Sequence, residues 1–340
     1  MDARRARRGR ECGRSRLTRR EWLVLSGAGL VATAGLGPRP GRAQAPVIRQ
    51  GYQTNMWGMP TYYILRSGHL EKRGLRFEEF SVPSGNLTMQ QMVARQVDLG
   101  TYAAPSFLLG NDKGQLVAIA QIEHVGKTAR VMARKELGVT RVADLRGMQI
   151  GNQAGSSTGN TFVDIIAARA GLKKGDYQEI KPNVNEMVAA AAARSIDAFV
   201  TVEPYASIAE ADGIATTVVN FYDYDRMPVL MAATPEFVEK HPETVVEYLR
   251  AWLDVGRDFK QSPAKVADVI YSFFTGKGYK MSRETFSKAL AGVEVDPGFP
   301  PDLRPYMQQT AEGLLKEKTI AAIPDWSRAL RPQFMERARA

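Results

Sequence analysis

Short β-rich apolar runs alternate with helix-like segments through the first two thirds of the chain that follows residue 46. An apolar run bounded by turn residues predicts a strand, and apolar positions three and four residues apart predict a helix. Their alternation predicts parallel α/β structure, with helices on both faces of a sheet. The predicted strand and helix pairs are 47–52 with 60–72, 75–80 with 87–95, 97–101 with 105–109, 149–153 with 160–170, and 196–202 with a helix that begins at Pro204.

The pattern changes beyond Thr234, where strands become scarce. A Thr-Pro-Glu start has the composition of a helix cap and first turn, and Val245, Leu249 and Trp252 then recur at helical spacing. The last third of the chain is therefore predicted to be helical. Further helices are expected around 264–274, 282–290 and 303–316.

The 295 residues from 46 to 340 are long for one α/β core and suit two lobes. Apolar runs at 128–134 and 229–233 are the predicted connections between the lobes. We therefore place lobe 1 at 46–128 plus 229–340 and lobe 2 at 129–228. After residue 46 we find no apolar segment of transmembrane length and no internal repeat.

The formal net charge of +10 is concentrated at the start of the chain. Residues 1–45 hold 11 basic and 3 acidic residues, whereas 46–340 hold 35 basic and 33 acidic residues. Because residues 46–340 are nearly neutral overall, their charge does not predict a nucleic-acid partner.

The basic segment 1–45 has the composition of a cleaved export signal, with an arginine-rich start, an apolar stretch at 22–36 and a small-residue site near Ala45. Residues 18–23, TRREWL, resemble the twin-arginine export motif, and an ordinary secretory signal is the alternative. Because Pro46 disfavours cleavage after Ala45, cleavage after Ala43 is a second possibility. The only cysteine, Cys12, precedes the apolar stretch, so we expect a periplasmic protein without disulfides or a lipid anchor.

Four segments of the chain, in this order and spacing, carry a family resemblance. From residue 46 nearly to its end, the chain resembles the periplasmic substrate-binding proteins of ABC importers for nitrate, sulfonates and taurine, including their thiamine-precursor relatives. The segments are 51–58 (GYQTNMWG), 96–101 (QVDLGT), 142–147 (VADLRG) leading to 155–159 (GSSTG), and 195–200 (SIDAFV) followed by 202–205 (VEPY).

The resemblance implies a two-lobe clamshell of the type II periplasmic-binding-protein fold, with two parallel-rich sheets flanked by helices and two hinge crossings. It also implies capture of a small ligand and its delivery to an ABC permease with its ATPase. We expect a monomer that has no cofactor and is not an enzyme. Nitrate, an alkanesulfonate, taurine, an aromatic carboxylate and a thiamine pyrimidine all stay open as ligands.

The candidate ligand-binding residues lie in loops that follow predicted strands, because open α/β sheets bind ligands beyond the carboxyl ends of their strands. In lobe 2, the loop 155–159 offers hydroxyls and backbone N–H groups at a helix start, which favours an anion. It lacks the Gly-Lys-Ser/Thr ending of a nucleotide-binding loop. The candidates are Gln53, Trp57 and Tyr102 in lobe 1 and Ser156, Ser157, Thr158 and Glu203 in lobe 2.

Two of these candidates have two interpretations each. Trp57 either forms a pocket wall or packs beneath the lobe. Glu203 either faces the ligand, where it would favour an amine or another hydrogen-bond donor, or pairs with an arginine or a hinge N–H group.

An enzymatic alternative rests on the hydrolase-like pattern G-x-S-x-G around Ser157, followed along the chain by Asp223 or Asp225 and then His241. No glycine-rich oxyanion loop follows an early strand, and His241 lies at an apparent helix start. The cysteine-rich and histidine-rich motifs of thiamine-precursor synthases are not present in the sequence. The three histidines are too widely separated to predict a metal site.

Overall fold

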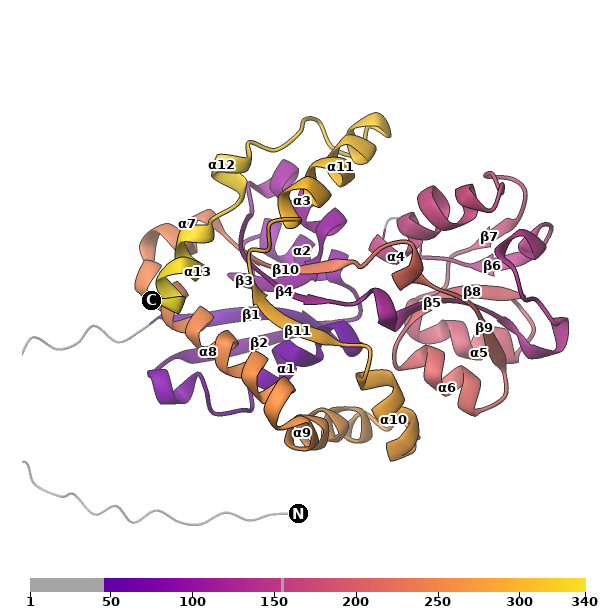
Figure 1. Cartoon of the computed structure of the whole chain (residues 1–340), viewed down its shortest axis with the longest axis horizontal. Coiled ribbons are helices and arrows are strands. Elements are labelled where there is room, and N and C mark those ends of the chain that lie inside the picture. Colours follow the sequence, from indigo (N-terminus) through magenta and orange to yellow (C-terminus); the bar gives the residue numbers. More distant parts are fainter. Residues whose placement is uncertain (1–45, 154–155) are drawn as a thin grey trace, which may run out of the picture. The chain divides into compact units, whose positions relative to one another are not determined.

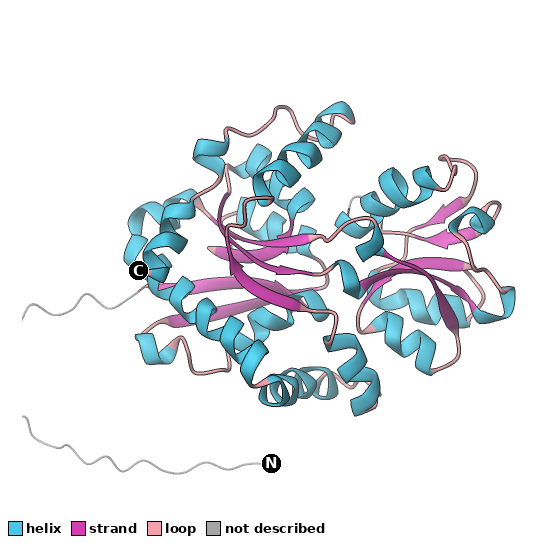
Figure 2. Ribbon diagram, in the orientation of Figure 1, coloured by secondary structure: helices cyan, strands magenta, loops and turns pink. Residues whose placement is uncertain are grey.

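The computed structural model describes residues 46–153 and 156–340, and the strands of this range form two sheets (Figures 1 and 2). The predicted export signal and Gly155 of the polar loop lie outside the described residues. The first sheet has the order β11-β4-β10-β3-β1-β2, and the second has the order β7-β6-β8-β5-β9. The strands of the first sheet are β1 (Val47–Gln53), β2 (Arg76–Val82), β3 (Leu99–Ala103), β4 (Val117–His124), β10 (Pro228–Ala233) and β11 (Glu294–Gly298). Those of the second are β5 (Ala129–Arg134), β6 (Gln149–Gly151), β7 (Gln178–Ile180), β8 (Ala198–Val202) and β9 (Ala215–Asn220).

Both sheets are mixed, which confirms the predicted α/β fold and refines the expected parallel-rich pairing. In the first sheet β1 pairs in parallel with β2 and β3, whereas β10 pairs antiparallel with β3 and β4. In the second, β6 pairs in parallel with β7 and β8, and β5 pairs antiparallel with β8 and β9. Apart from the edge pair of β11 with β4, the antiparallel pairs arise at β5 and β10, the strands with which the chain enters the second sheet and returns to the first. These crossings are residues 125–128 and 221–227.

Helices cover both faces of the first sheet, because alternate residues of its strands point to opposite sides. In β10, Met231 belongs to the apolar cluster on one face, while Leu230 and Ala232 belong to the cluster on the other. The helices that contribute to the Met231 cluster are α1 (Met59–Ile64), α7 (Pro235–Lys240), α8 (Pro242–Gln261), α9 (Pro263–Gly276), α10 (Arg283–Leu290) and α13 (Pro332–Arg339). Those that contribute to the other are α2 (Gly85–Val93), α3 (Ala104–Gly114), α11 (Leu303–Lys316) and α12 (Trp326–Ala329).

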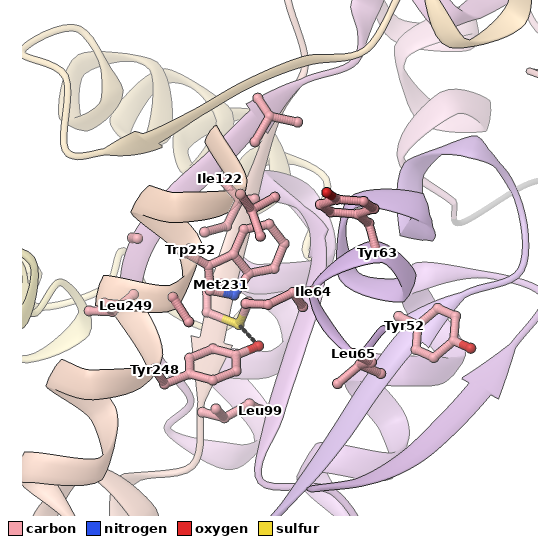
Figure 3. Packing of buried hydrophobic residues seen from close by; sticks show 14 of the residues in the cluster. Tyr52, Tyr63, Ile64, Leu65, Leu99, Ile122, Met231, Tyr248, Leu249 and Trp252 are labelled. Atoms are coloured by element: carbon pink, nitrogen blue, oxygen red, sulfur yellow. Dashed lines mark hydrogen bonds between the residues drawn. The ribbon is translucent and has the colours of Figure 1, made fainter. Parts of the chain in front are cut away.

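The amphipathic helix α8 supplies Trp252, the largest side chain of the first core, together with Tyr248 (Figure 3). Trp252 and Tyr248 are fully buried, and their ring centroids lie 6.5 Å apart. The Tyr248 hydroxyl donates a 2.5 Å hydrogen bond to Oε1 of Gln50 in β1, so its polar end is satisfied inside the core. Full burial of a large apolar side chain contributes about 1.5–3 kcal/mol, which makes α8 a main anchor of this face.

The second sheet is covered in the same way by shorter helices. Val131 and Val200 face one cluster, and their strand neighbours Met132 and Phe199 face the other. The first cluster includes residues of the π-helical turns Phe162–Ala167, which continue helix α4 (Ser157–Thr161). The opposite face packs against α5 (Met187–Ala192) and α6 (Tyr205–Ala211).

Three predictions about elements need correction. The helical pattern after Thr234 is two helices, because His241 adopts φ −132° and ψ 49° before Pro242, a residue that disfavours helical geometry in its predecessor. Strand β11 was not expected, since it is short and contains Pro297, which an edge strand tolerates. The helix predicted at 60–72 ends at Ile64. No helix of the described residues is long and apolar enough to cross a membrane.

Candidate functional site

Loops from both sheets converge on a small cavity of about 40 Å³. The first sheet contributes the loops after β1, β2 and β3, and the second contributes the loops after β6 and β7 and the end of β8. These are the carboxyl ends of neighbouring strands, where open α/β sheets bind ligands. We call this cavity the small pocket. Its polar lining residues are Gln53, Asn55, Trp57, Ser84, Asn86, Ser106, Gln153, Ser156, Ser157 and Thr158.

The small pocket is polar but uncharged, because no acidic, basic or histidine residue lines it among residues 46–153 and 156–340. Helices α2 and α3 both begin at its wall, at Gly85 and beside Ser106, and their N-terminal ends carry partial positive charge. The oxygen atoms assigned to the Gln53 and Asn86 amides are buried without a hydrogen-bond partner. Rotation of an amide exchanges its oxygen and NH₂ group, so each side chain can offer an acceptor or a donor to an occupant.

Gly85 allows helix α2 to begin against the pocket wall. A Cβ atom at this position would lie 2.7 Å from the Gln53 Nε2 atom and 2.7 Å from the Tyr102 Cβ atom. Real Cβ atoms do not approach other atoms this closely, so only glycine leaves room for the Gln53 side chain here.

Trp57 joins the first sheet to the crossing between the sheets. Its indole Nε1 donates a 2.6 Å hydrogen bond to the Thr128 Oγ1 atom, and its ring belongs to the apolar cluster of the second sheet. The preceding residue, Met56, donates its backbone N–H to the Glu203 carbonyl oxygen at 3.0 Å. Both interpretations of Trp57 therefore apply, because the side chain packs between the sheets and also lines the small pocket.

Ser156, Ser157 and Thr158 lie together at the start of α4 and line the small pocket. The Ser156 hydroxyl is the helix cap, since it accepts a 3.0 Å hydrogen bond from the Gly159 N–H and donates a 2.7 Å bond to the Gln153 carbonyl. The cap fixes the first turn and thereby presents Ser157 and Thr158 to the cavity.

The structure does not bring Tyr102 to the small pocket. Strand β3 extends to Ala103, two residues beyond the predicted end, so Tyr102 belongs to the strand and points into the apolar cluster beneath α2 and α3. Its hydroxyl donates to the Met92 Sδ atom at 3.3 Å. Complete burial raises the pKa of Tyr102 well above its ordinary value.

Glu203 does not line the small pocket either. Of its two predicted arrangements the structure has the second, in which the carboxylate pairs with an arginine. Its side chain is 1% exposed and pairs with the Arg130 guanidinium at 2.7 Å. The carboxylate also accepts hydrogen bonds from the Ser207 backbone N–H at 3.0 Å and the Ser207 hydroxyl at 2.9 Å. Burial raises the pKa of Glu203, while the charge of Arg130 and the Ser207 hydrogen bonds oppose the rise.

The Arg130 ion pair extends to a helix of the first sheet. Arg130 also contacts the Glu210 carboxylate at 3.2 Å, and Glu210 accepts a 2.5 Å bond from the Lys288 ammonium in α10. The hydroxyl of Tyr205 in α6 lies 3.1 Å from the hydroxyl of Tyr279, which precedes α10. Contacts between α6 and α10 therefore connect the layers of the two sheets outside the small pocket.

The residues of the hydrolase-like alternative are not brought together. Ser157 lines the small pocket, but His241 lies between α7 and α8 with its ring centroid 5.3 Å from that of Phe237. The Asp225 carboxylate accepts hydrogen bonds from the Met227 N–H and the Tyr306 hydroxyl. A nucleophile needs its base within hydrogen-bond reach, and His241 is not among the residues around Ser157. Among the described residues no group of histidine, cysteine or acidic side chains has the arrangement of a metal site.

The fold is that of the periplasmic binding proteins. The NMT1/THI5-like family matches residues 55–266, and the chain belongs to this family. A binding protein of Brucella abortus is 30% identical over 249 residues, which cover 71% of this chain and 75% of that protein. A protein of Escherichia coli named for the binding of aliphatic sulfonates is 26% identical over 226 residues, 64% of this chain and 68% of that protein.

Solved structures show the same fold at low sequence identity. The alkanesulfonate-binding protein of Xanthomonas axonopodis pv. citri, bound to MOPS, matches with a TM-score of 0.74 and 18% identity over 85% of this chain and 99% of that chain. The periplasmic nitrate-binding protein of Synechocystis PCC 6803 matches with a TM-score of 0.68 and 13% identity over 87% and 88%. The resemblance stated from the sequence is confirmed, and the relatives are named as binding proteins, in agreement with the expectation of a non-enzyme.

Proposed function

We propose that this chain is the extracytoplasmic solute-binding component of an ABC importer, which captures a small organic anion in the small pocket and delivers it to a membrane permease. The observation that carries the proposal is an uncharged polar pocket at the strand ends of both sheets, beside the starts of α2, α3 and α4. The names of the relatives support a periplasmic location and a sulfonate-like or nitrate-like ligand.

The pocket suits an anion held by neutral donors. Backbone N–H groups at helix starts, hydroxyls and amide NH₂ groups form short, charge-assisted hydrogen bonds to an anionic oxygen, and these offset the loss of its hydration. Ser157 and Thr158 would act from one lobe, and Gln53, Asn86 and Ser106 from the other. Because the ligand would contact both lobes only when they are closed, binding would shift the population toward the closed state that a permease recognises.

The size of the small pocket supports a role in binding the charged head group of a ligand. A volume of about 40 Å³ has room for roughly three water molecules, which is of the order of a nitrate ion or the charged end of a sulfonate. An attached organic body would require the lobes to separate further than in this conformation.

A ligand panel tests the proposal. The exported protein is titrated by calorimetry and thermal shift with nitrate, ethanesulfonate, taurine, benzoate and a thiamine pyrimidine at one ionic strength. We expect saturable binding of at least one anion, weakened about 10- to 100-fold in Ser157→Ala, as for a lost hydrogen bond to a charged group. The control Ser272→Ala removes an exposed hydroxyl in α9 and should bind like the wild type. Failure of every anion to bind, or equal affinities in the two variants, would overturn the proposal.

A further inference from the structure

Two side-chain amides of the first sheet lie close together in the wall of the small pocket. Gln53 is the last residue of β1, and Asn86 is the second residue of α2, the helix that follows β2. Strands β1 and β2 pair in parallel with Gln53 opposite Val82, so the loops that follow them start at the same edge of the sheet. A Cβ atom at Gly85 would lie 2.7 Å from the Gln53 Nε2 atom, which places the Gln53 amide against the start of α2.

The oxygen atoms of both amides are buried without a hydrogen-bond partner among residues 46–153 and 156–340. Gln53 is 1% exposed, and its Oε1 atom has no donor. The Asn86 Oδ1 atom is buried in the same way. Nearly all buried polar atoms of native proteins have a partner, so two such oxygens at one pocket indicate an occupant that donates hydrogen bonds.

The number of acceptors at these two side chains does not depend on how each amide is rotated. Each carboxamide carries one oxygen and one NH₂ group, and rotation exchanges their positions without changing the number of either. A bare anion can accept hydrogen bonds from the NH₂ groups, but it donates nothing to the oxygens. Water in an open pocket can donate to both oxygens, so a bare anion that expels this water leaves two buried acceptors unpaired.

The lining of the small pocket also limits the charge of the donor group. In the described part of the chain no carboxylate lines the pocket, and Glu203 outside it is already paired with Arg130. An ammonium group would therefore lose its hydration without a countercharge from the protein. This loss costs far more than the burial of a hydroxyl or an amide N–H that is hydrogen-bonded. A neutral donor suits the pocket better.

We propose that Gln53 and Asn86 determine specificity by selecting an acid that also carries a neutral O–H or N–H donor over a bare anion. This selection rests on the proposed function, in which Ser157 and Thr158 hold the acid group from the other lobe. The donor group then faces the two amides of the first lobe. A hydroxyl donates to one of their oxygens, and a primary amide has the two hydrogens needed for both.

Three sulfonates with the same two-carbon chain provide the test. They are 2-hydroxyethanesulfonate, ethanesulfonate and taurine, titrated into the exported protein by calorimetry at pH 7 and one ionic strength. The taurine amine is protonated at this pH, so the three chains end in a hydroxyl, a methyl and an ammonium group. We expect the hydroxyl compound to bind at least about tenfold more tightly than ethanesulfonate, because only its chain end donates without carrying a charge. Taurine should bind less tightly than the hydroxyl compound.

Variants that remove the acceptors test the assignment to these two residues. Gln53→Met and Asn86→Leu keep the approximate size of each side chain and remove its amide. The affinity ratio of the hydroxyl compound to ethanesulfonate should fall to about one in the double variant and in at least one single variant. The ratio is measured within each variant, so a general loss of stability or of binding does not change it.

Gln91→Met is the matched control. Gln91 also lies on α2 and also has a buried amide oxygen without a partner in the described part of the chain, but it does not line the small pocket. Its replacement should therefore leave the affinity ratio at the wild-type value.

Three results would overturn the assignment. They are equal affinities of the hydroxyl compound and ethanesulfonate in the wild type, tighter binding of taurine than of the hydroxyl compound, or an equal fall of the ratio in Gln91→Met. Failure of all three sulfonates to bind would also overturn it. The proposed function fails only if nitrate and the other anions of its panel do not bind either, so the two failures are distinguishable.

Discussion

Replacing Arg130 by methionine would leave the Glu203 carboxylate buried without its countercharge. Glu203 is 1% exposed and Arg130 12% exposed, so solvent does little to screen this pair. Methionine keeps most of the length and apolar bulk of arginine. The substitution therefore tests the ion pair rather than the packing around it.

The expected loss of stability is large for a single substitution. Breaking a buried ion pair by removing one partner costs about 3–5 kcal/mol, because the remaining charge is uncompensated. Ser207 still donates two hydrogen bonds to Glu203, which places the expected loss near the lower end, about 3 kcal/mol. Adding Glu203→Gln should recover part of this loss, since glutamine carries no charge and can still accept from Ser207.

The loss should grow as the pH rises. Burial already raises the pKa of Glu203, and removal of Arg130 takes away the main opposing charge, so the folded-state pKa rises further. A carboxyl group whose folded pKa exceeds the unfolded value stabilises the fold below the unfolded value, and this stabilisation is lost as the pH rises through the folded pKa. At pH values above the new folded pKa, each unit by which the substitution raises the folded-state pKa of Glu203 adds about 1.4 kcal/mol to the loss of stability.

Urea denaturation at pH 5 and pH 8 measures both effects. Arg141→Met is the matched control, because Arg141 pairs with Asp144 at the surface and is 76% exposed. We expect less than about 1 kcal/mol from the control at both pH values. A loss from Arg130→Met no larger than that of the control, or one that does not increase from pH 5 to pH 8, would refute the argument.

Three further predictions concern other parts of the chain. Glu123 is fully buried with an unpartnered Oε2 atom, and burial raises its pKa well above its ordinary value. The stability of the wild type therefore falls as the pH rises above about 4.3, the pKa of an unfolded glutamate. Thermal unfolding should show that Glu123→Gln is more stable than the wild type at pH 8 and not at pH 4. Gly85→Ala should destabilise the fold by about 1–3 kcal/mol and weaken ligand binding. The control Gly276→Ala should do neither, because no atom lies within 4 Å of a Cβ added there. Equal melting temperatures and ligand affinities in the two variants would contradict this prediction. Replacement of Arg19 and Arg20 by lysine should retain precursor in the cytoplasm on fractionation, and unchanged periplasmic yield would favour the general secretory route.

Local signals in the sequence predicted most of the fold and part of the candidate site. Strand and helix alternation is a short-range property, and so is the polar loop before α4 that contains Ser157. The rule that ligands bind beyond strand ends also led to Gln53 and Trp57, which line the small pocket. Applied to the strand at 149–151, the same rule indicates Gln153, which the sequence analysis did not name.

The remaining features depend on long-range packing. Tyr102 lies in the apolar core because strand β3 extends two residues beyond its predicted end. This extension depends on pairing with β10, which a local sequence pattern does not indicate. The partner of Glu203 is Arg130 on β5, which the sequence does not indicate. The cavity of about 480 Å³ beside α11 is lined by ordinary positions of an amphipathic helix, such as Leu303 and Leu314, so no sequence pattern distinguishes them from a core.

The central claim is that an anion binds directly to the helix starts around the small pocket, and backbone amide chemical shifts test it most directly. Ethanesulfonate is added to isotope-labelled exported protein, and the nitrogen–proton spectrum is recorded at each concentration. The account predicts that the largest saturable shifts occur at the amides of Gly85, Asn86, Ser106, Ser157 and Thr158. Shifts that are largest along α11 and around Asp164, or no saturable shifts at any of these amides, would contradict it.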